Sequence, residues 1–197
     1  MKKLPLALAV LVGLVVSAAG NTVMLSTRVQ DALTQLDALP SSAQLNSVHG
    51  SAQAALDNLR DIAGDDTIDP GVKIRAVRAL PQYCDLPCSP THEAHVALTT
   101  LVTTPRFRDA RSGSDVLILR AGIESLGVLR VPEDVDLLVP QLSHPSRDLR
   151  AAAAHALRDL GNPAAIDALR ARFVEEQVPQ VSLAISDALR VLGQPNP

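Results

Sequence analysis

The segment "LRAAAAHALRDLGNPAAIDAL", Leu149 to Leu169, predicts two helices joined by a tight turn. In its first half apolar residues recur every three or four positions, which places them on one face of a helix. Gly161 suits the left-handed position just past a helix end, and Pro163 suits the first turn of the next helix, where a missing N–H leaves no bond unmade. The repeating unit of this chain is therefore helix, turn, helix.

Similar units recur on both sides of this segment. "DALRVLGQP", Asp187 to Pro195, shares six of nine residues with "HALRDLGNP", which begins thirty-two residues earlier. Upstream, Leu126–Gly127 takes the position of Leu160–Gly161, and "PEDVDLL" takes that of "PAAIDAL". A weaker unit precedes it, and the last unit has only its first helix. We expect a repeat domain over residues 69–197, with about 3.5 repeats.

Two prolines interrupt this pattern. Pro81 stands where the third unit has Arg158, so the first helix of unit one should end near Leu80. Pro140 lies inside the expected second helix of unit two and should kink or shorten it.

Residues 21–64 lie outside the repeat. They contain two amphipathic stretches, "STRVQDALTQLDAL" and "PSSAQLNSVHGSAQAALDNLRDIAG", with Pro40 between them. We expect an N-terminal helical hairpin cap, because an end repeat otherwise leaves an apolar face in water.

The third unit resembles the short bacterial HEAT-like repeat, also called the phycobilisome-lyase-type HEAT repeat. The matching residues are Arg150, Ala153, Ala156, Leu157, Leu160, Gly161, Pro163, Ile166 and Leu169. The resemblance implies an all-α fold, an α-solenoid of HEAT-like helix pairs. It also implies a binding face on the second helices, about residues 91–104, 133–142 and 164–176.

The N-terminus has the three-part layout of a secretory signal peptide. Lys2 and Lys3 precede an uncharged apolar run, and small residues follow it up to Ala19. We predict a signal peptide over residues 1–19 and a periplasmic or secreted protein. Contact with a membrane is expected only if this segment is not cleaved, and the run is short for a span of about 20 residues.

Charge and composition narrow the function. The net charge is −3, and it falls to −5 without Lys2 and Lys3, which argues against nucleic-acid binding. Trp is absent and only three residues are aromatic, so the core must be aliphatic. No catalytic residues or cofactor are predicted, since the chain has neither G-x-S-x-G nor H-E-x-x-H.

"YCDLPCSPTHEAH" is the sharpest local feature of the chain. Two cysteines in an exported protein favour a disulfide between Cys84 and Cys88. A metal site of Cys84, Cys88, His92 and His95 is the alternative, because these residues are zinc ligands at short spacing.

Arginines supply the remaining candidates. Arg158 and Arg190 recur at one position of successive units, which favours a ladder between repeats. Contact with an acidic partner is the hypothesis for Arg106, Arg108, Arg111, Arg170 and Arg172.

The sequence thus favours a non-enzymatic exported scaffold or adaptor that binds another protein. A metal-binding module in the Cys84–His95 segment and a bilin-lyase-like, enzyme-associated role are the alternatives.

Overall fold

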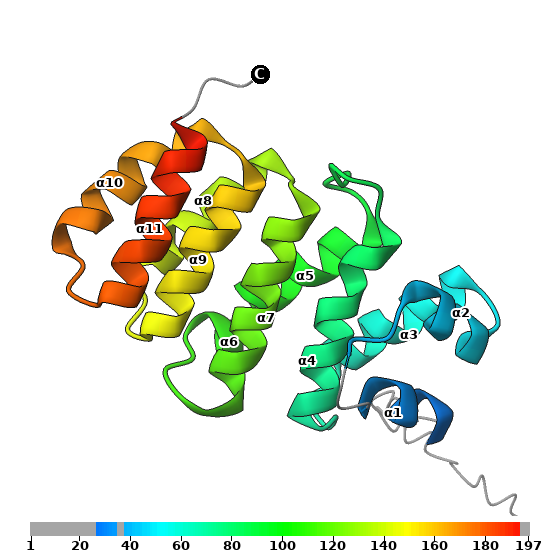
Figure 1. Ribbon diagram of the computed structural model, residues 1–197. Coiled ribbons are helices and arrows are strands. Elements are labelled where there is room, and N and C mark those ends of the chain that lie inside the picture. The colour runs from blue at the N-terminus through cyan, green and yellow to red at the C-terminus, as the bar shows by residue number, and fades with distance from the viewer. Residues whose placement is uncertain (1–26, 35–37, 194–197) are drawn as a thin grey trace, which may run out of the picture.

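The predicted repeat appears as pairs of packed helices. The computed structural model describes residues 27–34 and 38–193, and within these ranges it has eleven α-helices and no strand (Figure 1). The predicted all-helical fold, a solenoid of helix pairs, is confirmed. The predicted signal peptide lies outside the described residues. No helix in the described ranges is both long enough and apolar enough to span a membrane.

The third unit shows how the turn is built. Its first helix is α9, Arg147–Leu160, and Gly161 follows in the left-handed conformation with φ 74°. The Asn162 side chain accepts a hydrogen bond from the Ala164 N–H, which starts a short 3-10 helix that leads into α10, Ile166–Glu175. The turn expected from Gly161 and Pro163 is therefore present.

The other units follow the same order. Unit one consists of α4 (Pro70–Ala79) and α5 (Glu93–Thr103), unit two of α7 (Gly113–Leu129) and α8 (Val135–Leu138), and the last unit of α11 (Pro179–Leu192). The short helix α6 (Pro105–Arg108) lies between units one and two.

The two interrupting prolines act as expected. The helix α4 ends at Ala79 and is continued by a 3-10 helix, Leu80–Tyr83, which contains Pro81. The helix α8 is only four residues long, and a second 3-10 helix, Val139–Ser143, contains Pro140.

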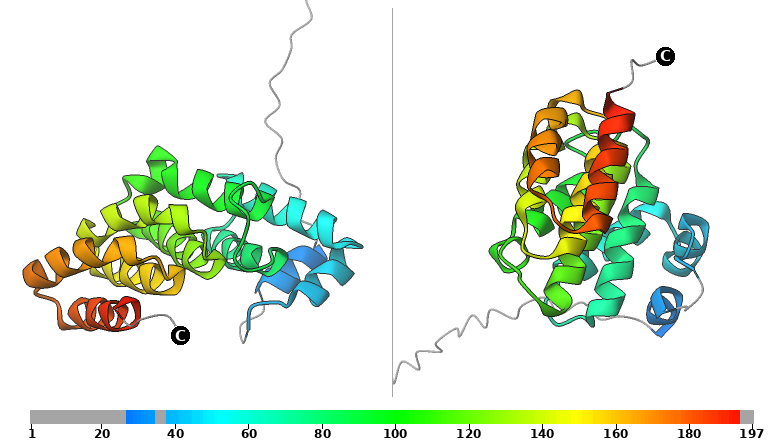
Figure 2. Two further views of the ribbon diagram at one scale, coloured as in Figure 1. Left: turned by 90° about the horizontal axis from the view of Figure 1, so that it is seen from above. Right: turned by 60° about the vertical axis from the view of Figure 1, so that its left-hand side comes forward.

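The helices form two rows. The first helices α4, α7, α9 and α11 pack side by side, and the second helices lie behind them in Figure 1. Figure 2 shows both rows from above, with α5, α8 and α10 on one side of the stack. One apolar core runs between the rows, from Val29 in α1 to Leu192 in α11. Each unit therefore buries its apolar faces against its neighbours.

The N-terminal segment differs from the expected two-helix hairpin. Three helices are present: α1 (Thr27–Thr34), α2 (Ser42–His49) and α3 (Ala52–Gly64). The second amphipathic stretch is split because Gly50 takes a left-handed φ of 86° and Ser51 then caps α3. The helix α3 packs on α4 and α5.

Gly127 differs from its counterpart Gly161. It lies inside α7, which continues to Leu129 and is followed by Arg130 with a left-handed φ of 55°. A Cβ at Gly127 would lie 2.6 Å from the Ala156 Cα. This glycine therefore allows α7 and α9 to approach closely, whereas Gly161 forms a turn.

Candidate functional site

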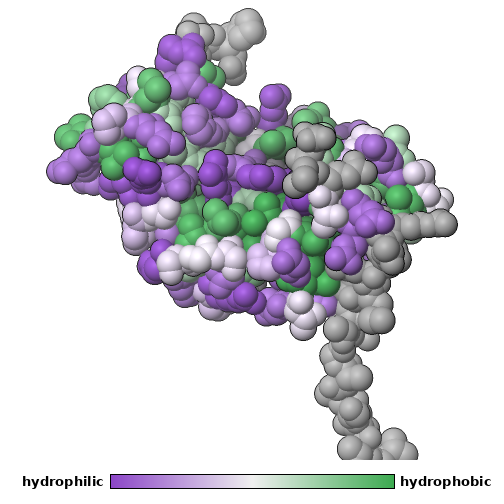
Figure 3. All heavy atoms as spheres, turned by 60° about the horizontal axis from the view of Figure 1, so that its bottom comes forward, coloured by the Kyte–Doolittle hydropathy of each residue, from purple (hydrophilic) through white to green (hydrophobic). Residues whose placement is uncertain are grey.

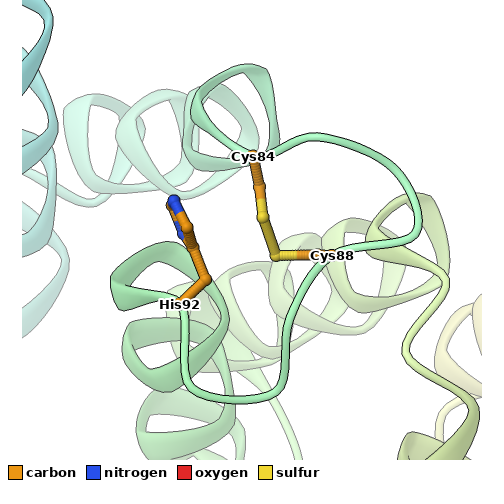
Figure 4. A group of neighbouring side chains, drawn as sticks. All are labelled: Cys84, Cys88 and His92. Atoms are coloured by element: carbon orange, nitrogen blue, oxygen red, sulfur yellow. A yellow bond between two sulfur atoms is a disulfide. The ribbon is translucent and has the colours of Figure 1, made fainter.

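The segment between the 3-10 helix after α4 and the start of α5 brings Cys84, Cys88 and His92 together (Figure 4). The two sulfur atoms are 2.02 Å apart and the Cα atoms 5.6 Å, a separation that suits a disulfide. The backbone is held at both cysteines: the Cys84 N–H donates to the Pro81 carbonyl, and the Cys88 N–H donates to the Leu129 carbonyl at 2.8 Å. The loop is thus fastened to unit two.

His92 lies beside the two sulfur atoms and also starts α5. Its Nδ1 accepts a hydrogen bond from the Ala94 N–H at 3.2 Å, so the imidazole caps the helix. A donor atom from each of Cys84, Cys88 and His92 lies within 4.8 Å of the others. Three of the four predicted metal ligands are therefore together.

His95, the fourth predicted ligand, lies elsewhere, and the four-ligand prediction is corrected to three. Its buried imidazole faces unit two: Nδ1 lies 2.8 Å from the Pro90 carbonyl, and Nε2 lies 2.9 Å from an oxygen of Asp134. Residues 92 and 95 are three apart on one helix, but His92 is the cap and its side chain turns back to the backbone. Spacing alone therefore overestimated the cluster.

The His95–Asp134 contact holds a proton inside the protein. Both ring nitrogens face oxygen acceptors, so a hydrogen must lie between Nε2 and the carboxylate. Burial raises the pKa of Asp134 above its ordinary value, and the hydrogen bond with His95 acts in the opposite direction. This pair joins unit one to unit two and has no signal in the repeat pattern.

The arginines proposed as a partner-binding patch do not form one cluster. Arg106 donates to Asp115 from two nitrogens and also pairs with Asp66, while Arg108 pairs with Asp109. These hydrogen bonds raise the pKa of both guanidinium groups. The positive charges of Arg106 and Arg108 are thus largely balanced by acids. Figure 3 shows the lower side of the molecule, where hydrophobic residues gather near the middle and hydrophilic residues surround them.

The remaining three arginines have separate surroundings. Arg111 is exposed and donates to the Ala110 carbonyl. Arg170, on α10, is exposed, and its nearest acid is Asp167 at 3.8 Å. Arg172 is mostly buried against Glu176. Whether any of the five contacts a partner stays a prediction.

A buried carboxylate joins the last helices, and the sequence patterns did not reveal it. Arg150 in α9 makes two hydrogen bonds to Glu176, at 2.7 and 3.0 Å, and Arg172 adds two more, at 2.8 and 3.1 Å. The Glu176 side chain is 1% exposed and also accepts from the Val178 N–H. Hydrogen bonds from Arg150, which has the largest effect, from the Val178 N–H and from Arg172 together lower the pKa of Glu176 from 4.5 to about 2. Before the structure, Arg150 stood out only as part of the repeat motif and Arg172 only as a candidate partner contact, and neither was linked to Glu176.

The expected arginine ladder is present in part. Arg158 donates to Asp187 of the next unit at 2.8 Å and also to Asp159, and these hydrogen bonds raise its pKa. Arg190 reaches the same Asp187, but within its own helix. Arg158 therefore links two repeats and Arg190 does not.

Two grooves open on the row of second helices. One, of about 360 Å³, lies between α3, α5 and α6 and is lined by Arg60, Val96, Thr100 and Phe107 among others. The second, of about 170 Å³, lies between α5 and the α8 segment; Thr103, Arg108, Asp136 and Leu137 are among its lining residues. The helix α5 forms the ridge between them. Seven of the nine residues that line the second groove fall in the predicted ranges 91–104 and 133–142, whereas only five of the eleven that line the first groove do.

Comparison with known families agrees with this geometry. Residues 104–190 match a model of HEAT repeats, which covers units two and three and most of α11. No curated protein matches the chain. The phycobilisome-lyase subtype is not part of the match. Residues 104–190 are thus a HEAT-repeat region.

Proposed function

We propose that this chain is an exported, non-enzymatic scaffold that binds another protein across α5 and the two grooves beside it. HEAT repeats typically bind proteins. The observation that carries the proposal is the pair of grooves on neighbouring second helices, because a partner lying across α5 can place one side chain in each. The grooves are lined by apolar and threonine side chains together with charged ones, a mixture found at many protein interfaces.

A matched pair of valines provides the test. Val96 on α5 is 46% exposed and lines a groove, while Val191 on α11 is 39% exposed, lies on the other row and lines neither groove. A photo-crosslinking residue at position 96, expressed in the native cells, should give a discrete adduct with one protein, and position 191 should not. Equal adducts from both positions, or none from position 96, would refute the proposed face. In an otherwise native chain, Thr100→Glu should remove the adduct from position 96.

Export rests on the N-terminal sequence, with Lys2, Lys3 and the apolar run ahead of Ala19. Mass spectrometry of the protein from the cell envelope or medium should find a mature chain that begins at Gly20 or Asn21. Recovery of the intact chain from the cytoplasm would show that the export proposal is wrong.

A further inference from the structure

The donors Cys84, Cys88 and His92 meet on a backbone that is already held in place. A hydrogen bond holds the Cys84 amide to Pro81, another holds the Cys88 amide to Leu129, and the His92 amide donates to the Ser89 carbonyl. Cys88 is 4% exposed, and Cys84 and His92 are half-buried. Donor atoms on a backbone that is held in place and partly shielded from solvent favour the binding of a metal ion.

These donor types suit zinc. Thiolate sulfur and imidazole nitrogen are the usual zinc ligands, and a tetrahedral ion with Zn–S bonds of about 2.3 Å sets its sulfur atoms about 3.8 Å apart. The Cα separation of 5.6 Å between the cysteines leaves room for both arrangements. Rotation of the two side chains after reduction can therefore open a place for the ion between Cys84, Cys88 and His92.

We propose that Cys84, Cys88 and His92 bind one Zn²⁺ ion when the two cysteines are reduced, and that oxidation to the disulfide releases it. The dithiol loses two protons as the ion binds. In the release step a disulfide oxidant takes two electrons from the thiolates: the Cys84–Cys88 bond forms, the oxidant's S–S bond breaks, and its two sulfurs take up two protons from water. This property is independent of the scaffold function.

The neighbouring groups leave the fourth position to water. The imidazole of His95 is occupied by Pro90 and Asp134, and the carboxylate of Glu93 is bonded to Arg60 and Gln53. A site with three protein ligands and one water is open, like those that exchange or use their metal.

Zinc binding also competes with the helix cap. The His92 Nδ1 lone pair accepts the Ala94 N–H, and the neutral tautomer that does so carries its proton on Nε2. Coordination through either nitrogen therefore breaks the cap bond. The substitution His92→Asn removes the ligand and keeps a good capping side chain, so it separates metal binding from helix stability.

The test measures zinc affinity of the purified full chain by competition with a coloured chelator. The chain reduced with a phosphine should bind one Zn²⁺ at least 100-fold more tightly than the oxidised chain. Cys84→Ser should lose this gain, and His92→Asn should weaken binding at least tenfold with unchanged helical circular dichroism. The matched control His155→Asn, on the exposed face of α9, should bind like the wild type.

A second readout reports the ligands directly. Co²⁺ added to the reduced chain should give a thiolate-to-metal charge-transfer band, which His92→Asn shifts and Cys84→Ser weakens. Equal zinc affinity in the reduced and oxidised chains would overturn the proposal. So would a His92→Asn variant that binds zinc like the wild type, because the third ligand would then be absent.

Discussion

The two junctions made by α9 use different physics. On one side α9 meets α7 through a glycine, with Gly127 pressed against the Ala156 backbone. On the other side α9 meets α11 and the segment before it through apolar packing and also through charges, with Arg150 on Glu176 and Arg158 on Asp187. Each junction also contains a buried alanine. Ala156, in α9, packs against Gly127 of α7, and Ala188 lies in α11.

The difference shows that a repeat fixes the spacing of helices but not the means of holding them. A steric contact of this kind depends little on pH or salt, whereas a buried carboxylate with two arginines depends on its ionisation. We therefore expect the α7–α9 junction to fail through changes of volume and the α9–α11 junction through changes of charge.

The largest effect is expected from Gly127→Ala. The new methyl group would lie 2.6 Å from a backbone atom of Ala156, which cannot turn aside, so the helices must separate. We expect a loss of about 3 kcal/mol in the free energy of unfolding, measured in urea. Gly64→Ala, at the end of α3 with open space around it, is the control and should change stability by less than about 1 kcal/mol. Equal effects of the two substitutions would show that the contact between Gly127 and Ala156 does not limit the packing of α7 on α9.

Glu176→Gln tests the charged junction. It leaves Arg150 and Arg172 without their buried anion, and we expect a loss of about 3 kcal/mol at neutral pH. Since the folded pKa of about 2 lies below the unfolded value of 4.5, Glu176 contributes its full stability above about pH 5.5, and this is lost as the pH falls towards 2. Urea unfolding at several pH values should show this loss in the wild type and a smaller one in the variant. Parallel pH profiles would contradict the assignment.

The junction of units one and two should show an intermediate effect, because it depends on a proton shared between His95 and Asp134. Asp134→Asn places an N–H donor towards the His95 Nε2, as a protonated Asp134 would, and should change stability by less than about 1 kcal/mol. Asp134→Ala leaves the buried ring unpaired and should lose about 2 kcal/mol. Because burial raises the pKa of Asp134, its protonated form stabilises the fold at low pH, and this contribution declines as the pH rises through the folded pKa. Thermal unfolding of both variants from pH 4 to 8 checks the order; a loss for Asp134→Asn as large as that for Asp134→Ala would show that Asp134 acts only as a fixed anion.

Among the substitutions expected to destabilise the fold, Gly161→Ala should have the smallest effect. Its φ of 74° disfavours a side chain, but no atom lies within 4 Å of a new Cβ. We expect a loss of about 1 kcal/mol from backbone strain alone. The loss in the free energy of unfolding should thus be about three times larger for Gly127→Ala than for Gly161→Ala, and one series of urea titrations can measure both. A larger loss at Gly161 than at Gly127 would invert the roles assigned to the two glycines.

Local sequence signals predicted most of the fold. The apolar periodicity located the helix pairs, and Gly161 and Pro163 located a turn. Pro81 and Pro140 correctly indicated that α4 and α8 end early. Alignment with Gly161 placed Gly127 at a helix end, whereas it lies inside α7. A Leu-Gly pair does not show whether the glycine ends the helix or lets a neighbouring helix approach closely.

The site was predicted less completely, because its contacts join residues far apart in the sequence. His95 and Asp134 are 39 positions apart, and Arg150 and Glu176 are 26 apart, so no local pattern records either pair. Cys84, Cys88 and His92 were found because they are close in sequence. His95 was included for the same reason and proved to belong to another contact.

Hydrogen exchange in the Glu176→Gln variant tests most directly whether the two junctions of α9 are held differently. The helix α11 (Pro179–Leu192) is held to the stack by apolar packing together with buried charge, whereas α7 (Gly113–Leu129) meets α9 through close packing. We predict that at neutral pH the amides of α11 exchange at least tenfold faster than in the wild type, while those of α7 keep their protection. Equal loss of protection in both helices, or unchanged protection in α11, would contradict the account.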